Sequence, residues 1–163
     1  MKKKMLFVSI LVIAFFATAC GKSKLDNKES RTYEDLLNGY VDAMMDSDID
    51  KLKKLYPPFY VEYAKNSLTK ENLEKSLERA KENFGDDFKI TFDIGEKTQL
   101  TEDELHEINE RMRDYYSAKV DATECYKFSG TITFKGSKSS DTDPLESMGY
   151  CKYDGGWYLT EIM

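Results

Sequence analysis

The chain has 163 residues, of which 24 are lysine or arginine and 30 are aspartate or glutamate, so its net charge at pH 7 is −6. A chain this acidic is a poor ligand for the phosphates of nucleic acid. Its single histidine argues against His-dependent catalytic triads and multi-histidine zinc sites, and its three cysteines include no Cys-x-x-Cys pair.

The first 19 residues have the features of a signal peptide. Three lysines precede an apolar segment over residues 5–16, which is shorter than the roughly 20 apolar residues that a membrane-spanning helix needs. The small residues of Ala17-Thr18-Ala19 suit a signal peptidase, and Cys20 follows at once. The tetrapeptide resembles a bacterial lipobox, although Ala17 stands where a lipobox usually has leucine. We predict a signal peptide at 1–19 and a lipid on Cys20; the alternative is ordinary cleavage after Ala19 with an incidental cysteine.

A spacer and one domain are predicted to follow Cys20. The stretch GKSKLDNKESR is polar, charged and without apolar periodicity, which predicts a flexible spacer. Together with the lipidated cysteine, this spacer is expected to cover residues 20–32. Without the three lysines of the leader, 21 basic residues face 30 acidic ones, so the remaining 144 residues have a net charge of −9. That length suits a single domain at 33–163. We expect its acidity to keep it soluble and to oppose adhesion to anionic lipid headgroups.

Helical periodicity dominates the first half of this domain. Apolar residues recur every three or four positions after three residues suited to capping a helix, Thr32, Asp48 and Thr69. Two prolines at 57–58 interrupt the second helix, a short helical segment follows over 59–65, and Gly85 is a natural end for the third helix. After an intervening strand, a further helix is expected at Thr101, because Thr101 and Glu104 have the spacing of a capping box.

The alternating pattern of β-strands replaces helical periodicity after Gly85 and again after residue 118. In FKITFDIGE apolar and polar residues alternate, which predicts a strand with one wet face. From Lys119 onward one strand face is expected to hold Val120, Ala122, Tyr126, Phe128, Ile132 and Phe134. KGSKSSDTD is predicted to be a loop, LESMGYCKY a return strand, and DGGWYLTEI a tight turn into the last strand. The order ααα-β-α-βββ predicts an α+β fold with helices packed on one face of a curved, mainly antiparallel sheet.

The C-terminal segment YCKYDGGWYLTEI resembles the ending of small bacterial lipoprotein domains with a cystatin-like or nuclear-transport-factor-2-like cone fold. LTEDELHEINERM and YVDAMMDSDIDKLKKLYPP are similar to helical segments of that family. The resemblance covers most of the chain from about Tyr33, and its motifs are structural ones of low specificity. Gly155-Gly156 stands where the family more often has one glycine and a lysine. The resemblance implies a pocket between helices and sheet, and it implies no particular reaction.

Glu124 is the most suggestive polar residue. Strict alternation places Glu124 on the apolar face beside Ala122 and Tyr126. A carboxylate turned into a cone pocket would have a raised pKa and could act as an acid or base, as in enzymes of the superfamily that the chain resembles. The alternative is a β-bulge or strand end that leaves Glu124 in water.

Four tyrosines are candidates for lining the same pocket with hydroxyl donors: Tyr40, Tyr56, Tyr60 and Tyr63. Core and rim positions are the alternative for them, because the chain has 11 tyrosines. We expect neither a metal nor a cofactor. Asp46, Asp48 and Asp50 have the opening spacing of a calcium loop, but Lys51 and Pro57 stand where that loop needs glycine and glutamate.

The two remaining cysteines, Cys125 and Cys151, are an even number in an exported domain. If the two strands beside the predicted loop pair so that residue numbers sum to 276, Tyr126 faces Tyr150 on the apolar face. The same register sets Cys125 opposite Cys151 on the outer face, within disulfide range. A shift by one residue would set apolar side chains against a polar face. We predict a structural disulfide; two free thiols are the alternative in an envelope that is not oxidising.

These features predict a lipoprotein on the extracytoplasmic face of a bacterial cell membrane, with its lipid anchor in the bilayer. Its domain is expected to bind a partner protein, a peptide or a small ligand without catalysis, and not nucleic acid. Two alternatives stay open: an enzyme that uses an inward carboxylate such as Glu124, and a structural or accessory domain of the cell envelope.

Overall fold

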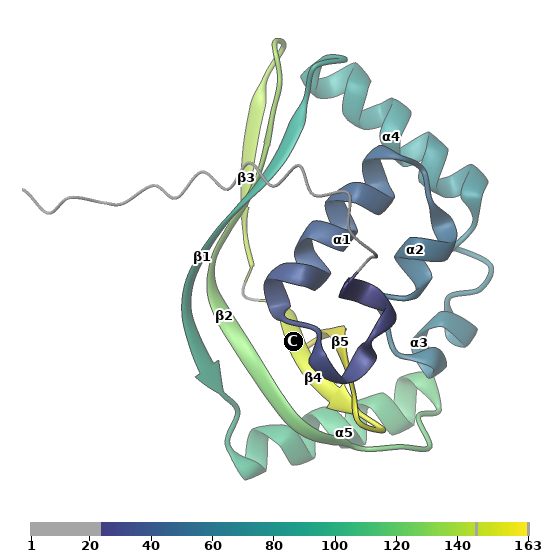
Figure 1. Cartoon of the computed structure of the whole chain (residues 1–163), viewed down its shortest axis with the longest axis vertical. Helices are drawn as coiled ribbons and strands as arrows, with labels where there is room; N and C mark the ends of the chain where they lie inside the picture. Colours follow the sequence, from purple (N-terminus) through teal and green to yellow (C-terminus); the bar gives the residue numbers. More distant parts are fainter. Residues whose placement is uncertain (1–23, 146, 163) are drawn as a thin grey trace, which may run out of the picture.

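A computed structural model describes residues 24–145 and 147–162. In this part of the chain an α+β fold combines five α-helices with an open antiparallel sheet of five strands (Figure 1). The expected signal peptide and Cys20 lie outside the described residues. Among the residues that are described, no helix has the length and apolar character needed to cross a membrane.

The elements follow the predicted α+β order, with two 3-10 turns and one further strand in addition. Two 3-10 turns come first, η1 (Lys24–Asp26) and η2 (Lys28–Ser30). Four helices follow: α1 (Tyr33–Met45), α2 (Ile49–Lys53), α3 (Pro58–Tyr63) and α4 (Lys70–Phe84). Strand β1 (Lys89–Gln99) leads into α5 (Glu102–Tyr116). The chain continues through β2 (Ala122–Lys135), β3 (Ser140–Pro144), β4 (Met148–Tyr153) and β5 (Gly156–Glu161).

The helices begin at the caps that the sequence predicted. Four side chains accept a hydrogen bond from the backbone N–H three residues on: Thr32, Asp48, Thr69 and Thr101. Glu104 completes the predicted capping box, because the Thr101 N–H donates to its carboxylate at 2.8 Å. Each such cap stabilises a helix by about 1 kcal/mol. Gly85, with a φ of 107°, ends α4 as predicted.

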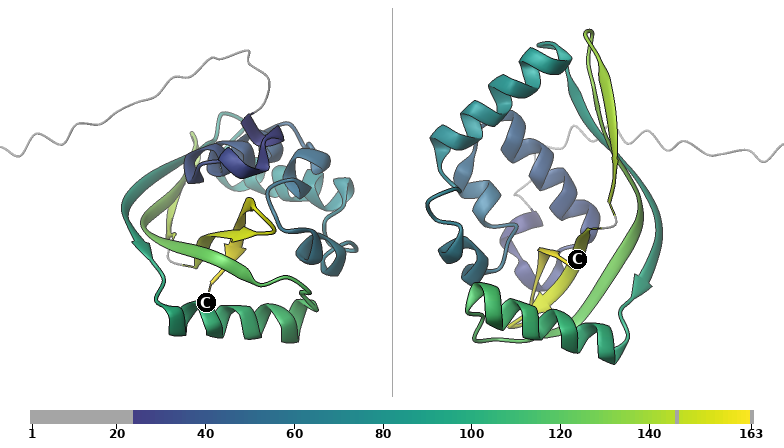
Figure 2. Two further views of the ribbon diagram at one scale, coloured as in Figure 1. Left: turned by 60° about the horizontal axis from the view of Figure 1, so that its bottom comes forward. Right: turned by 180° about the vertical axis from the view of Figure 1, so that it is seen from behind.

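Helices cover both faces of the sheet, which corrects the expectation of one covered face. The strand order is β1-β2-β4-β5, and β3 pairs with the far end of β2. Figure 2 shows α5 on the opposite side of the strands from α1, α2 and α4, whereas α3 contacts α5. We call the α1 side the concave face and the α5 side the outer face. Five residues form the buried cluster of the outer face: Ala122, Cys125, Cys151, Tyr153 and Tyr158.

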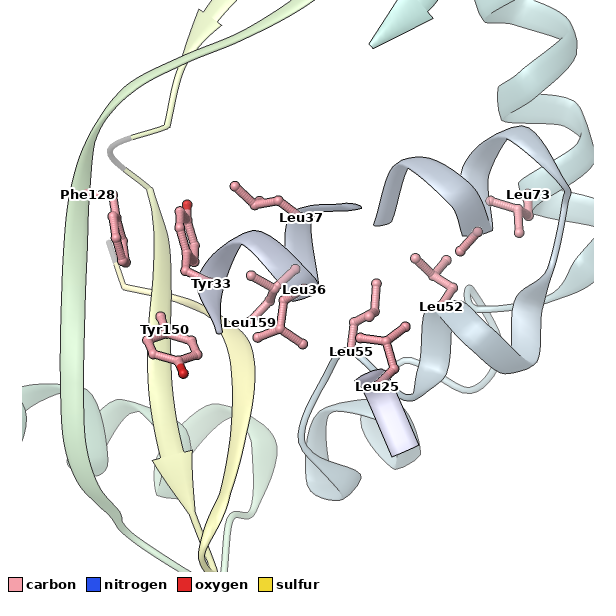
Figure 3. Packing of buried hydrophobic residues seen from close by; sticks show 11 residues of the cluster. Leu25, Tyr33, Leu36, Leu37, Leu52, Leu55, Leu73, Phe128, Tyr150 and Leu159 are labelled. Atoms are coloured by element: carbon pink, nitrogen blue, oxygen red, sulfur yellow. The ribbon is translucent and has the colours of Figure 1, made fainter. Parts of the chain in front are cut away.

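The main core lies between α1, α2 and the concave face. Tyr33 stacks on Phe128 with ring centroids 3.7 Å apart, and Tyr150 meets Tyr33 edge-on (Figure 3). Leu36 and Leu159 are fully buried in the same cluster. This packing joins the first helix to the strands closest to the C-terminus, so the two ends of the domain stabilise each other.

The second part of the predicted spacer belongs to the folded domain. Leu25 is 4% exposed and packs in the main core, and the Arg31 side chain is 2% exposed. The Arg31 guanidinium donates to the carbonyl groups of Leu25, Lys54 and Trp157. The Tyr150 hydroxyl donates in turn to the Arg31 carbonyl. Two buried side chains and these hydrogen bonds hold residues 24–32 on the domain. Because the segment does not pack as an amphipathic helix, its sequence shows no helical periodicity.

Strand β3 corrects the predicted loop. It pairs with Thr131–Lys135 of β2, and the hydroxyl oxygens of Thr133 and Thr142 lie 3.0 Å apart across the pair. All five residues of β3 are exposed, so no apolar alternation marks it in the sequence. Pairing with a longer strand, not burial, makes this segment extended.

The expected face of β2 changes at its beginning. Val120 lies before the strand and is 44% exposed. The pairing with β4 shifts between Ala122 and Glu124, so a β-bulge interrupts the alternation there. Ala122 therefore packs in the outer-face cluster with Cys125, not on the concave face with Tyr126.

Candidate functional site

A groove with a volume of about 530 Å³ opens between α4, the start of α2 and the far end of β2 and β3. We call it the helix–sheet groove. Its apolar floor comes from four helical residues and one strand residue, Met44, Leu52, Leu73, Phe84 and Phe134. The volume lies within the usual range of small-ligand sites, which are also mainly apolar with a few polar groups.

The groove is held at one end by the turn that joins β2 to β3. The Lys138 N–H donates to the Phe84 carbonyl at 2.9 Å, and the Ser139 hydroxyl donates to the Asn83 carbonyl at 2.8 Å. These bonds satisfy carbonyl groups at the C-terminal end of α4. The end of α4 is thereby fixed to the β2–β3 turn, which sets the width of the groove.

Two carboxylates stand on the sheet wall of the groove. Asp141 lies opposite Phe134 in the β2–β3 pair, and both line the groove together with Asp143. Asp141 and Asp143 are exposed, and neither forms an ion pair with any residue in the described ranges. The helix wall carries Arg79 and the amide of Asn72. The groove therefore combines an apolar floor with a carboxylate wall and a polar wall.

Two of the four predicted tyrosines line the groove. Tyr40 and Tyr56 contribute to its lining, and burial raises the pKa of both hydroxyls, which remain neutral hydrogen-bonding groups at neutral pH. Tyr60 and Tyr63 do not. Tyr60 borders a separate cavity of about 30 Å³ near α5, and Tyr63 is 63% exposed. They differ because α3 restarts after Pro57 and packs toward α5 instead of α4.

Glu124 lies on the concave face but outside the groove lining. The alternative interpretation was a β-bulge that leaves Glu124 in water. The bulge is present, but Glu124 is half-buried. Its carboxylate accepts a hydrogen bond from the Tyr126 hydroxyl, and this bond raises the pKa of Tyr126. The candidate acid or base and the groove are therefore separate features of the sheet.

Cys125 and Cys151 form a disulfide between β2 and β4, with Cα atoms 4.1 Å apart. Their register is the predicted one, in which Tyr126 also pairs with Tyr150. Both cysteines are buried in the outer-face cluster, at 1% and 0% exposure. The disulfide thus lies on the face opposite to the groove, where it links two strands inside a buried cluster.

Sequence reasoning missed the carboxylate wall because it assigned Asp141 and Asp143 to a loop. Their i, i+2 spacing, which puts two side chains on one face of a strand, was the only available signal. Comparison with protein family models, curated proteins and solved structures finds no match for this chain. Within the described ranges, no cluster of His, Cys, Asp and Glu side chains is arranged to hold a metal ion.

Proposed function

We propose that this chain is a lipid-anchored binding protein on the extracytoplasmic face of a bacterial membrane, and that its domain holds a partner protein, peptide or small ligand in the helix–sheet groove without catalysis. The observation that carries the proposal is the groove itself, with its apolar floor and the exposed carboxylates of Asp141 and Asp143 in its lining. A domain of the cystatin-like or nuclear-transport-factor-2-like cone type is part of the proposal. The long curved strands with helices on their concave side support it.

The lining favours a ligand that is apolar in part and basic in part. A ligand that covers the apolar floor gains about 25 cal/mol of hydrophobic free energy for each Å² of apolar surface that it removes from water. Asp141 and Asp143 outnumber Arg79 in the lining, so the charge of the groove favours a basic group over an acidic one. The net charge of −9 for residues 20–163 acts in the same direction at longer range.

A lipid on Cys20 would hold the domain close to the membrane. Because Leu25 is already packed in the core, only residues 21–24 separate the anchor from the folded domain. Five Cα-to-Cα steps span about 18 Å at full extension. A domain held this close to the bilayer suits a partner that is itself in or near the membrane surface.

Site-specific photo-crosslinking in native membranes tests the proposal. A photoreactive residue replaces Ser76, which lines the groove, and a matched control replaces Glu78, which is exposed on the same helix outside the groove. We expect a discrete cross-linked product from position 76 and none from position 78. No product at position 76, or the same products at both positions, would overturn the proposal.

A further inference from the structure

A second group of side chains lies on the concave face, outside the groove lining. Tyr126 of β2, Tyr150 of β4 and Trp157 of β5 form a run of rings across three neighbouring strands. Tyr150 and Trp157 are stacked with centroids 4.2 Å apart and planes 11° apart, and Tyr126 lies 5.9 Å from Trp157. Tyr126 and Trp157 are partly exposed, so solvent reaches the edge of this run.

Two ammonium groups of the protein lie over these rings. The Lys97 Nζ is 3.7 Å from the ring centroid of Tyr126 and 5.8 Å from that of Tyr150. The Lys152 Nζ is 5.6 Å from the ring centroid of Trp157. A cation within about 6 Å of a ring centroid is attracted by the negative face of the ring. Each of the three rings therefore already has a lysine ammonium within cation–π distance.

The backbone brings Lys97 to this face through a β-bulge. Ile94 pairs with Gly130, but the register then shifts and Lys97 pairs with Phe128 of the main core. In a regular strand, Lys97 would point to the same side as Asp93, away from the core. The Glu96 N–H donates to the Ser129 hydroxyl at 2.8 Å and holds the bulge. Bulges of this kind often re-aim a side chain beside a functional site.

Glu124 supplies the negative charge of the group. Its carboxylate accepts from the Tyr126 hydroxyl and forms no ion pair with a residue of the described ranges. It is half-buried, so water screens its charge less than that of an exposed carboxylate. A cation over Tyr126 gains from this neighbour as well as from the ring.

We infer that Glu124, Tyr126, Tyr150 and Trp157 form a binding site for a small soluble cation with an alkylated ammonium group, and that this cation takes the place of the Lys97 ammonium. We call these residues the aromatic cation site. The ammonium of lysine is strongly hydrated, whereas alkylated ammonium ions are the ligands that aromatic cages characteristically hold. Lys97 is exposed and can leave the ring, while Lys152 bounds the site on the Trp157 side. The inference is independent of the proposed function of the groove.

Trp157 is the single tryptophan of the chain, so its fluorescence reports on the site directly. The protein is titrated with choline and, in parallel, with 3,3-dimethyl-1-butanol, its neutral isostere with carbon in place of nitrogen. We expect a saturable change with choline and binding of the isostere that is weaker by about fivefold or more. An equal response to both compounds, or no saturation with choline, would overturn the site.

Variants separate binding at this site from an unspecific response. Lys97→Gln removes the competing ammonium and should tighten choline binding about two- to fivefold, whereas Glu124→Gln should weaken it by a similar factor. Lys89→Gln, an exposed lysine of the same strand that faces Lys135, is the matched control and should leave the affinity unchanged. Thermal unfolding of each variant verifies that it is folded. Unchanged affinity in Lys97→Gln would refute the assignment, and a response only to phosphatidylcholine vesicles would refute a soluble ligand.

Discussion

The side chain of Asn109 in α5 forms two hydrogen bonds with the backbone of Ala122 at the start of β2. Its Nδ2 donates to the Ala122 carbonyl at 3.0 Å, and the Ala122 N–H donates to its Oδ1 at 2.7 Å. Both residues are buried, at 8% and 3% exposure. This amide satisfies the backbone beside the β-bulge, where regular strand pairing is interrupted.

We predict that Asn109→Ala destabilises the domain by about 2–4 kcal/mol, because it leaves a buried N–H and a buried carbonyl without partners. Urea unfolding followed by circular dichroism measures the change. Asn38→Ala, at an exposed position of α1, serves as control and should change the free energy of unfolding by less than about 0.5 kcal/mol. A similar loss in both variants would contradict the role given to Asn109.

The disulfide should resist alkylation and contribute to stability. Unfolded, unreduced protein is expected to take no alkyl label at Cys125 or Cys151, which mass spectrometry reads directly. The bridge closes a sequence separation of 26 residues, for which the chain-entropy model gives about 3 kcal/mol. Reductant should therefore lower the free energy of unfolding by about that amount in the wild type and leave the Cys125→Ala/Cys151→Ala variant unchanged. Labelling without reductant would show two free thiols.

Glu104 should titrate well below an ordinary glutamate. The hydrogen bond from Lys127, followed by those from Thr101, lowers the pKa of this carboxyl from 4.5 to about 2. Since the folded-state pKa is depressed, its stabilising contribution is complete above the unfolded value near 4.5 and is lost as pH falls from there toward 2. NMR titration measures the pKa. Lys127→Met should raise the pKa toward its ordinary value and Lys135→Met should not; equal values in all three proteins would be the contrary result.

Leu25→Ala should destabilise the domain by about 2–4 kcal/mol, because Leu25 is buried in the main core beside Gly39 and Leu55. Unfolding in urea measures this loss, and limited proteolysis should cut the variant earlier within residues 24–32. Glu29→Ala is the control, since Glu29 is exposed in the same segment. If the two variants behaved alike, residues 24–32 would be dispensable for the fold.

Metabolic labelling with a fatty acid tests the anchor. The wild type should incorporate the label and Cys20→Ala should not. The Cys125→Ala/Cys151→Ala variant is the matched control and should be labelled like the wild type, because it retains Cys20. Equal labelling of wild type and Cys20→Ala would contradict a lipid on Cys20.

Features that depend on neighbours in the sequence were predictable. A capping box needs only Thr101 and Glu104, three residues apart, and both of its hydrogen bonds are present. The pairing of Cys125 with Cys151 was also predicted, because the register that sets Tyr126 opposite Tyr150 on the apolar face sets the two cysteines opposite each other, and a shift by one residue would mix the faces. The α+β class and most helix boundaries belong to the same category.

Tertiary structure alone decided where alternation breaks and which segments dock. The bulge before Lys97 turns a lysine onto the concave face, and the one before Glu124 turns Ala122 onto the outer face. Strand β3 and residues 24–32 are ordered by partners distant in sequence, such as Trp157 for Arg31. Such contacts leave no periodic pattern in the sequence, because one buried side chain, or pairing with the edge of a neighbouring strand, is enough to hold a short segment. The carboxylate wall of the helix–sheet groove and the aromatic cation site both depend on these long-range contacts, so the sequence predicted a pocket with Tyr40 and Tyr56 in its lining but neither of these features.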